Sequence, residues 1–199
     1  MPHLVSPALP AGSLRVLEQP RLVVDDRTTL RPWRDGDAET VMAAFDCADI
    51  QRWHVRRMDS PAEARAWISA WAMRWDEETD ASWAIVDGGD RPIGQAGLRT
   101  VSLFEATAGL SYWVLPAARG AGVAVRATQA LTRWAFGVAG LHRLALDHST
   151  ANPASCRVAT KLGFGVEGTA RGVARHADGW HDMHLHARLR TDEARPSSG

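Results

Sequence analysis

A glycine-containing turn in the middle of the chain has the residue types of an anion-binding site. It reads Arg119-Gly120-Ala121-Gly122-Val123-Ala124 and connects an apolar run, Leu110–Leu115, to a segment with helical spacing of apolar residues. Glycines let the backbone bend with its N–H groups facing outward. Unpaired amides and the positive end of a helix dipole would then meet and favour a phosphate. A tight connection without any ligand is the alternative for such a Gly-x-Gly pair.

The turn differs from two common nucleotide-binding motifs. It is not G-x-G-x-x-G, and no Lys-Ser or Lys-Thr pair follows Gly122. A dinucleotide site and a P-loop are therefore both disfavoured.

Several short phrases, in their order and spacing, resemble the GNAT superfamily of acyl-CoA-dependent N-acetyltransferases. The likeness runs from about Arg21 to Leu189. Within the superfamily the chain looks most like the branch that acetylates the N-termini of ribosomal proteins, the RimJ/RimL type. The phrases are Leu30-Arg31-Pro32-Trp33, Arg119-x-x-Gly122-x-Ala124, Trp134-Ala135-Phe136 before Gly140-Leu141-His142-Arg143, Asn152-Pro153-Ala154-Ser155 and Lys161-Leu162-Gly163-Phe164.

The resemblance implies that an acyl-CoA, most simply acetyl-CoA, is the co-substrate. Backbone groups of Trp113 and Val114 would pair with the pantetheine arm, as an added strand does. Arg119 would add charge or shape the turn. Asn152 would hydrogen-bond the arm, a role compatible with capping the helix that starts at Pro153. The amides implied to hold the pyrophosphate are those of Gly120, Ala121, Gly122, Val123 and Ala124.

The implied reaction is direct attack of a neutral amine on the thioester, followed by loss of the CoA thiolate. Many GNAT enzymes place a proton-donating tyrosine seven positions after the motif asparagine, where this chain has Ala159. The RimJ/RimL branch implies a serine instead, which is Ser155 here. The alternative for Ser155 is an ordinary serine in the first turn of a helix.

The general base is harder to assign. Positions where the branch often carries glutamates hold Gly109 and Ala145. His148 is the best remaining candidate, ahead of Glu105 and Glu167, because an ordinary histidine pKa of ~6.5 lies near neutral pH. A structural histidine at a strand end is the alternative. A protein α-amine, with a pKa of ~8, needs little help from a base, which favours such an acceptor over lysine at ~10.4.

Three histidines near the C-terminus invite comparison with a metal site. His181, His184 and His186 lie near Asp182, and in a strand Asp182, His184 and His186 would share one face. No second cluster in the sequence completes the site, and polar faces of edge strands often look like this. We therefore expect no metal.

The hydrophobic periodicity predicts a mixed α/β domain with the element order β-α-α-β-β-β-α-β-α-β-β. Ser60-Pro61-Ala62-Glu63 matches a capping box and predicts a helix start, and the segment before it, 50–57, is predicted to be a loop or a short helix. The resemblance implies a mostly antiparallel central sheet, flanked by helices, in which the fourth strand splays from the fifth. We expect one domain over 21–190. A loose extension over 1–20 and a flexible tail over 191–199 are expected because Pro, Ser, Gly and charged residues dominate both ends.

Composition excludes several partner classes. The 23 basic residues balance 23 acidic ones, so we expect no nucleic acid and no anionic membrane surface as a partner. No apolar run approaches the ~20 residues of a membrane span, and the N-terminus lacks a signal-peptide pattern. The two cysteines, Cys47 and Cys156, are expected to be packing residues in a cytoplasmic protein.

Taken together, the sequence predicts an acyl-CoA-dependent N-acyltransferase that modifies a primary amine on a protein N-terminus or a small molecule. One alternative is another acyl donor, such as succinyl-CoA, if Arg52, Arg56 or Arg57 faces the thioester end. A different class of alternative is a non-catalytic CoA-binding or interaction module. A homodimer through the last strands or through exposed tryptophans is compatible with the sequence.

Overall fold

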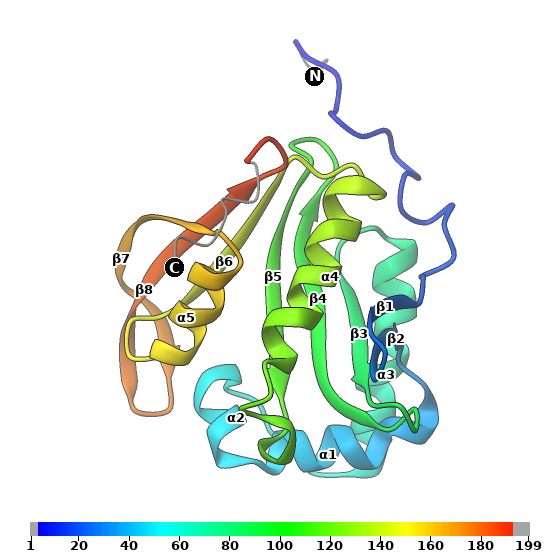
Figure 1. Cartoon of the computed structure of the whole chain (residues 1–199), viewed down its shortest axis with the longest axis vertical. Helices are drawn as coiled ribbons and strands as arrows, with labels where there is room; N and C mark the ends of the chain where they lie inside the picture. Colours follow the sequence, from blue (N-terminus) through cyan, green and yellow to red (C-terminus); the bar gives the residue numbers. More distant parts are fainter. Residues whose placement is uncertain (1–3, 193–199) are drawn as a thin grey trace.

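Eight strands form one sheet in the computed structural model, which describes residues 4–192 (Figure 1). The strand order is β1-β2-β3-β4-β5-β6-β8-β7, and only the β5–β6 pair is parallel. The mostly antiparallel sheet predicted from the sequence is therefore confirmed. The strands are β1 (Leu22–Asp25), β2 (Thr28–Pro32), β3 (Ala81–Val86), β4 (Pro92–Ser102), β5 (Thr107–Val114), β6 (Arg143–Ser149), β7 (Gly165–His176) and β8 (Gly179–Leu189).

Helices cover both faces of this sheet, because its strands carry apolar side chains on both sides. In β3, Trp83 and Ile85 belong to a core that includes α4, whereas Ala84 and Val86 belong to a second core with α1 and α3. This alternation follows the two-residue period of a strand. The helices are α1 (Ala38–Asp46), α2 (Ala48–His54), α3 (Pro61–Asp76), α4 (Val123–Gly137) and α5 (Pro153–Lys161), with short 3-10 turns η1 (Asp35–Asp37) and η2 (Pro116–Ala118).

The strands β5 and β6 separate soon after they start. They pair only from Thr107–Gly109 to Arg143–Ala145, and beyond these residues the two ribbons diverge (Figure 1). On its other side β6 pairs with β8 along its whole length, from Arg143 to Ser149. The splay expected between the fourth and fifth strands of the domain is thus confirmed, and it leaves one edge of β5 without a neighbouring strand.

Two helix starts follow the caps that the sequence predicts. The Ser60 hydroxyl accepts a hydrogen bond from the Glu63 amide at 3.2 Å, and Pro61 is the first residue of α3. The Asn152 side chain accepts one from the Ser155 amide at 3.1 Å at the start of α5. The segment after Cys47, predicted to be a loop or a short helix, forms α2.

Residues 12–17 of the N-terminal segment pack on the domain, so this part of the extension predicted over 1–20 has fixed contacts. The Glu78 carboxylate accepts hydrogen bonds from the amides of Gly12 and Leu14, both at 2.6 Å, and Leu14 is 2 % exposed. The Trp75 indole donates to the carbonyl of Leu17 at 3.0 Å. These partners are more than fifty residues away in the chain, so local composition gave no sign of them. Most of the predicted tail, 193–199, lies outside the described residues.

Within residues 4–192, no helix combines the length and the apolar character that crossing a bilayer requires.

Candidate active site

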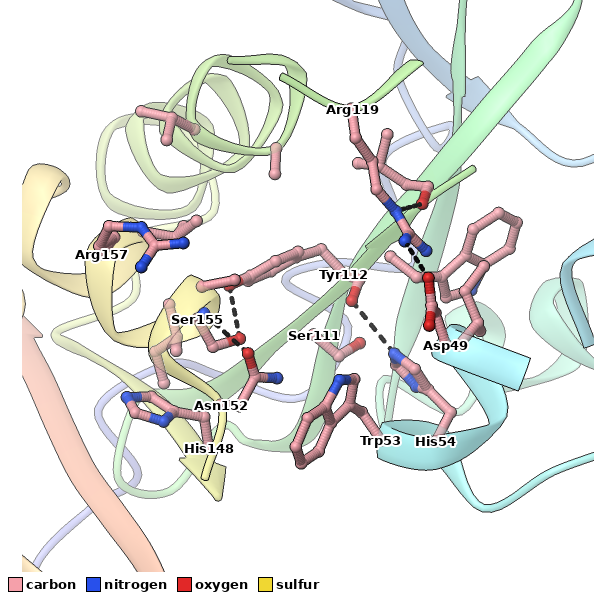
Figure 2. A pocket seen from close by; sticks show the side chains of 18 of the residues that line it. Asp49, Trp53, His54, Ser111, Tyr112, Arg119, His148, Asn152, Ser155 and Arg157 are labelled. Atoms are coloured by element: carbon pink, nitrogen blue, oxygen red, sulfur yellow. Dashed lines mark hydrogen bonds and ion pairs between the residues drawn. The ribbon is translucent and has the colours of Figure 1, made fainter. Parts of the chain in front are cut away.

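The gap between β5 and β6 contains a cavity of about 640 Å³ (Figure 2). Its walls come from β5 and β6, from the N-terminal ends of α4 and α5, and from α2. All of the predicted site residues except Ala121 line it. The fold therefore brings together predicted site residues that lie as far apart in the sequence as Trp113 and Ser155.

The predicted phosphate-binding turn has backbone amides available at the start of α4. Gly120 and Gly122 have φ values of 81° and 72°, in the left-handed region that favours glycine. Gly122 is the N-cap of α4 and no side chain caps that end of the helix. First-turn amides without a cap bind anions well, because the helix dipole adds to their positive charge. The carbonyl of Ala121 faces Arg126 instead of the cavity.

Arg119 shapes the turn by binding to two other elements. Its Nε donates to the carbonyl of Val114 at 3.0 Å, and its Nη1 lies 2.7 Å from the carboxylate of Asp49 in α2. The guanidinium thus links the end of β5 to α2 in the wall of the cavity (Figure 2). Of the two roles that the sequence suggested for Arg119, this geometry supports the shaping of the turn.

Alternate residues of β5 turn their backbone groups toward the cavity. The carbonyl of Trp113 faces β4, because a Cβ added to Gly94 would lie 2.5 Å from its oxygen. The carbonyls of Tyr112 and Val114 point the other way, and they accept hydrogen bonds from His54 Nε2 at 3.2 Å and from Arg119. The backbone edge that faces the cavity therefore belongs to Tyr112 and Val114, whereas the carbonyl of Trp113 faces β4; the binding of a pantetheine arm by Trp113 and Val114 stays a prediction.

Ser155 and Tyr112 form a hydroxyl pair that the sequence did not reveal. The Tyr112 and Ser155 oxygens are 2.8 Å apart, and both side chains line the cavity (Figure 2). Burial raises the pKa of Tyr112 to about 12, so the phenol stays protonated at neutral pH. In the sequence, Tyr112 is only one member of the apolar run Leu110–Leu115. The signal that could have found it is the strand alternation, which turns Tyr112 toward the motif serine of α5.

His148, the predicted base, lies in the cavity wall with both ring nitrogens in contact with protein atoms. Its Nδ1 is 2.8 Å from the carbonyl oxygen of Ser149, and its Nε2 is 3.1 Å from Nε2 of His186. Burial lowers the pKa of His148. Glu105 and Glu167, the two other candidates for the general base, are not among the described residues that line the cavity.

A second chain of hydrogen bonds leads from the cavity wall to the β7–β8 turn. The Ser149 hydroxyl accepts from the amide of Ala151 at 3.1 Å and lies 2.7 Å from Nδ1 of His181. Nε2 of His181 lies 2.8 Å from the carboxylate of Asp178. A carboxylate only accepts, so Nε2 carries the proton and Nδ1 accepts from Ser149. This arrangement can move a proton from the cavity to the surface.

The buried ring of His54 should make the stability of the fold pH-dependent. Burial lowers the pKa of His54 from 6.5 to about 4. Between these values the unfolded chain binds a proton that the folded chain does not, so the free energy of unfolding falls as the pH falls. From pH 7 to pH 5 this group should remove about 2 kcal/mol. Urea unfolding at both pH values measures the loss.

In His54→Gln the free energy of unfolding should fall less between pH 7 and pH 5 than in the wild type, by about 2 kcal/mol. His142→Gln, which changes an exposed histidine, should match the wild type. An equal loss in His54→Gln and the wild type would refute the assignment.

Comparisons with known proteins agree with this geometry. The family model described as an acetyltransferase (GNAT) domain matches residues 27–165. The uncharacterised N-acetyltransferase YoaA of Bacillus subtilis is 28% identical over 148 residues, covering 73% of this chain and 84% of that protein. The solved ribosomal-protein-S5-alanine acetyltransferase from Vibrio fischeri has a TM-score of 0.79 at 20% identity, covering 87% of this chain and 98% of that one. RimL, a ribosomal α-N-protein acetyltransferase solved with coenzyme A, has a TM-score of 0.76 at 19% identity, covering 85% and 98%. Because the family model spans well over half of the chain, this protein belongs to the GNAT family and is a GNAT-type N-acetyltransferase.

Proposed function

We propose that the enzyme transfers an acetyl group from acetyl-CoA to the α-amine of a protein N-terminus. The observation that carries the proposal is one cavity that joins an open strand edge, uncapped helix amides and a hydroxyl pair. These are the parts needed to hold a pantetheine arm, a pyrophosphate and a leaving thiolate. The family match supports the donor, as does the binding of coenzyme A by RimL.

In the proposed complex the pantetheine arm lies along β5 and pairs with the backbone of Tyr112 and Val114. The pyrophosphate meets the amides of Gly120, Gly122 and the first turn of α4. Arg157 and Lys161 line the cavity from α5 and add positive charge on that side. Together these contacts direct the thioester toward the Tyr112–Ser155 pair.

The chemistry proposed at this pair is a proton relay. A neutral amine attacks the thioester carbonyl, the C–N bond forms, and the C–S bond breaks as the oxyanion collapses. The amine loses one proton and the thiolate gains one, so the overall balance needs no external acid. Ser155 donates its proton to the sulfur and regains one from solvent, which takes up the proton that the amine loses, while Tyr112 stays protonated and holds the serine hydroxyl in place. With its pKa raised to about 12, Tyr112 acts here as a neutral phenol.

Two routes remain for the proton that the amine loses. His148 as the base stays a prediction, and the contacts of both its ring nitrogens weigh against it. The series of hydrogen bonds from Ser149 through His181 to Asp178 is the second route. It is supported by the short lengths of these bonds and by the position of Asp178 at the surface. A protein α-amine does not need a strong base, because a fraction of its molecules is already neutral at pH 7.5.

The proposed acceptor path lies between α2 and the β7–β8 turn. His176 contacts the carbonyl of Arg52 at 2.8 Å, and the ring of Trp53 packs against His176. The Arg52 guanidinium lies over Trp53 at 4.8 Å and approaches Asp178 at 3.9 Å, while Arg57 pairs with Asp59. Two of the three cations that could favour a succinyl group are thus paired, which supports acetyl as the acyl group.

The acceptor proposal is tested by the release of thiol from acetyl-CoA with matched peptides. One peptide has a free N-terminal Ser or Ala, and its partner has the same sequence, a blocked N-terminus and an internal lysine. At pH 7.5 about 25% of an α-amine is neutral but only about 0.1% of a lysine, so the free peptide should react at least about tenfold faster. Equal rates for the two peptides, or thiol release only with small polyamines, would contradict the α-amine assignment.

The relay predicts separate effects on turnover and on binding. Ser155→Ala and Tyr112→Phe should each lower kcat about 100-fold, the typical contribution of a positioned proton donor. The Kd for CoA should change less than about threefold, since neither hydroxyl is needed to hold the pyrophosphate. Thr160→Ala is the matched control, because its hydroxyl lies on the same helix and donates to the carbonyl of Cys156 at 3.0 Å. A Ser155→Ala enzyme with wild-type kcat would remove Ser155 from the mechanism.

For the glycine turn before α4 we expect the main effect on CoA binding. Gly122→Ala should weaken CoA binding about tenfold, because a left-handed alanine costs about 1–2 kcal/mol and its Cβ would lie 3.0 Å from Arg126 Nη1. Gly137→Ala, in the last turn of α4 with open space around the new Cβ, should leave the affinity unchanged. Isothermal titration calorimetry with CoA measures both. Unchanged affinity in Gly122→Ala would refute the phosphate-binding role of the turn.

A further inference from the structure

We propose that a cluster of three histidines and one cysteine beneath α5 binds one Zn²⁺ ion. The cluster is His148 in β6, His184 and His186 in β8, and Cys156 in α5, and its ligand atoms all lie within 4.8 Å of one another. This metal site is a property separate from the acetyltransferase activity. The zinc proposal does not depend on which amine the enzyme acetylates. The sequence shows no second group of ligands near His184 and His186. The fold supplies one, because it brings His148 and Cys156 to these two histidines.

Strand register places the three histidines on one face of the sheet. His148 is directly opposite His184 in the β6–β8 ladder, and His186 is opposite Leu146, two residues along β6 from His148. Side chains two residues apart in a strand point to the same side. Helix α5 follows β6 in the chain and lies in front of β6 and β8 in Figure 1. Cys156 reaches the histidines from this helix.

Two of the rings are oriented as metal ligands are. His148 Nδ1 lies 2.8 Å from the carbonyl oxygen of Ser149, and His186 Nδ1 lies 3.3 Å from that of Phe164. A carbonyl only accepts, so each Nδ1 carries a hydrogen and each Nε2 holds a lone pair. Histidines that bind metals usually donate their other N–H to a carbonyl or a carboxylate in this way.

The two lone pairs face each other. His148 Nε2 and His186 Nε2 are 3.1 Å apart, and both residues are buried. Two lone pairs at this distance repel each other unless a cation or an extra proton lies between them. Two nitrogens on a tetrahedral Zn²⁺ are separated by about 3.3 Å, given Zn–N bonds of about 2.0–2.1 Å. The observed separation therefore fits a shared metal ion.

The two other members also have a ligand atom to offer. Nδ1 of His184 is buried and has no hydrogen-bond partner among the described residues. The Cys156 thiol is free. A buried polar nitrogen without a partner is unfavourable, and coordination would provide the missing interaction. Three imidazoles and a thiolate suit Zn²⁺ better than Mg²⁺ or Ca²⁺, which prefer oxygen ligands.

The proposed ion has a positioning role. Four protein ligands fill a tetrahedral shell and leave no place for water or substrate, which is typical of structural zinc sites. Cys156 directly follows Ser155, and His148 directly precedes Ser149. Zinc would therefore fasten α5 to β6 and β8 and hold the Ser155 hydroxyl against Tyr112. Asp182, which shares the strand face in the sequence pattern, accepts from the amide of Gly172 at 2.8 Å instead.

The test uses the metal-stripped full-length protein and Zn²⁺. We expect it to bind one ion per chain, with no comparable binding of Mg²⁺. Cys156→Ser and His184→Ala should each weaken Zn²⁺ binding at least about tenfold, since even partners of metal ligands cost 10–100-fold. Cys47→Ser, which changes the other free cysteine, should bind like the wild type.

A thiol-labelling experiment tests the same site without any variant. Zn²⁺ should protect one of the two cysteines of the wild type from alkylation, and peptide mass spectrometry should identify it as Cys156. With Co²⁺ in place of Zn²⁺, a thiolate-to-cobalt absorption band should appear and should be absent in Cys156→Ser. Labelling of Cys156 that is unaffected by Zn²⁺, or equal Zn²⁺ affinity in Cys156→Ser and the wild type, would overturn the proposal. Neither readout needs turnover, so its failure would leave the acetyltransferase proposal standing.

Discussion

A buried strand edge without a neighbouring strand is the constraint on which the site depends. Backbone N–H and C=O groups that are shielded from water need partners. In β5 the ladder to β6 stops after Gly109, yet the strand continues to Val114. The carbonyl of Tyr112 is bound by His54 and that of Val114 by Arg119. Side chains from α2 and from the turn thus satisfy part of this edge, and a ligand that adds itself as a strand can satisfy more.

The width of the gap is fixed from both ends. At one end, β5 and β6 are joined by their short parallel pairing. At the other end, α2 bridges the two halves, because His54 binds the backbone of β5 and Arg52 binds His176 at the end of β7. Arg119 adds a third link through Asp49 in α2. A cleft clamped in this way presents its polar groups in fixed positions, which lowers the cost of ordering them around a substrate.

The sequence predicted the parts of the structure that depend on local signals. The caps at Ser60 and Asn152, the glycine turn before α4 and the motif serine were all found because each rests on residues close together in the chain. The structure added what depends on distant pairing. Tyr112 meets Ser155 only because β5 and β6 splay, and His148 meets His184 only because β8 pairs with β6. The packing of Leu14 against the domain likewise depends on Glu78, which no local pattern connects to it.

The contacts of His148 join the question of the base to that of the metal. A base needs a lone pair directed at the amine, but the lone pair of His148 is directed at Nε2 of His186. If zinc occupies that position, the ring has no nitrogen left to accept a proton. The amine proton would then leave through Ser149 and His181 or through water. An α-amine with a pKa of ~8 can lose its proton along such a path without a strong base, whereas a lysine side chain would need a stronger base. If zinc binds to these histidines, the proposed site would therefore favour an N-terminal amine over a lysine as the acceptor.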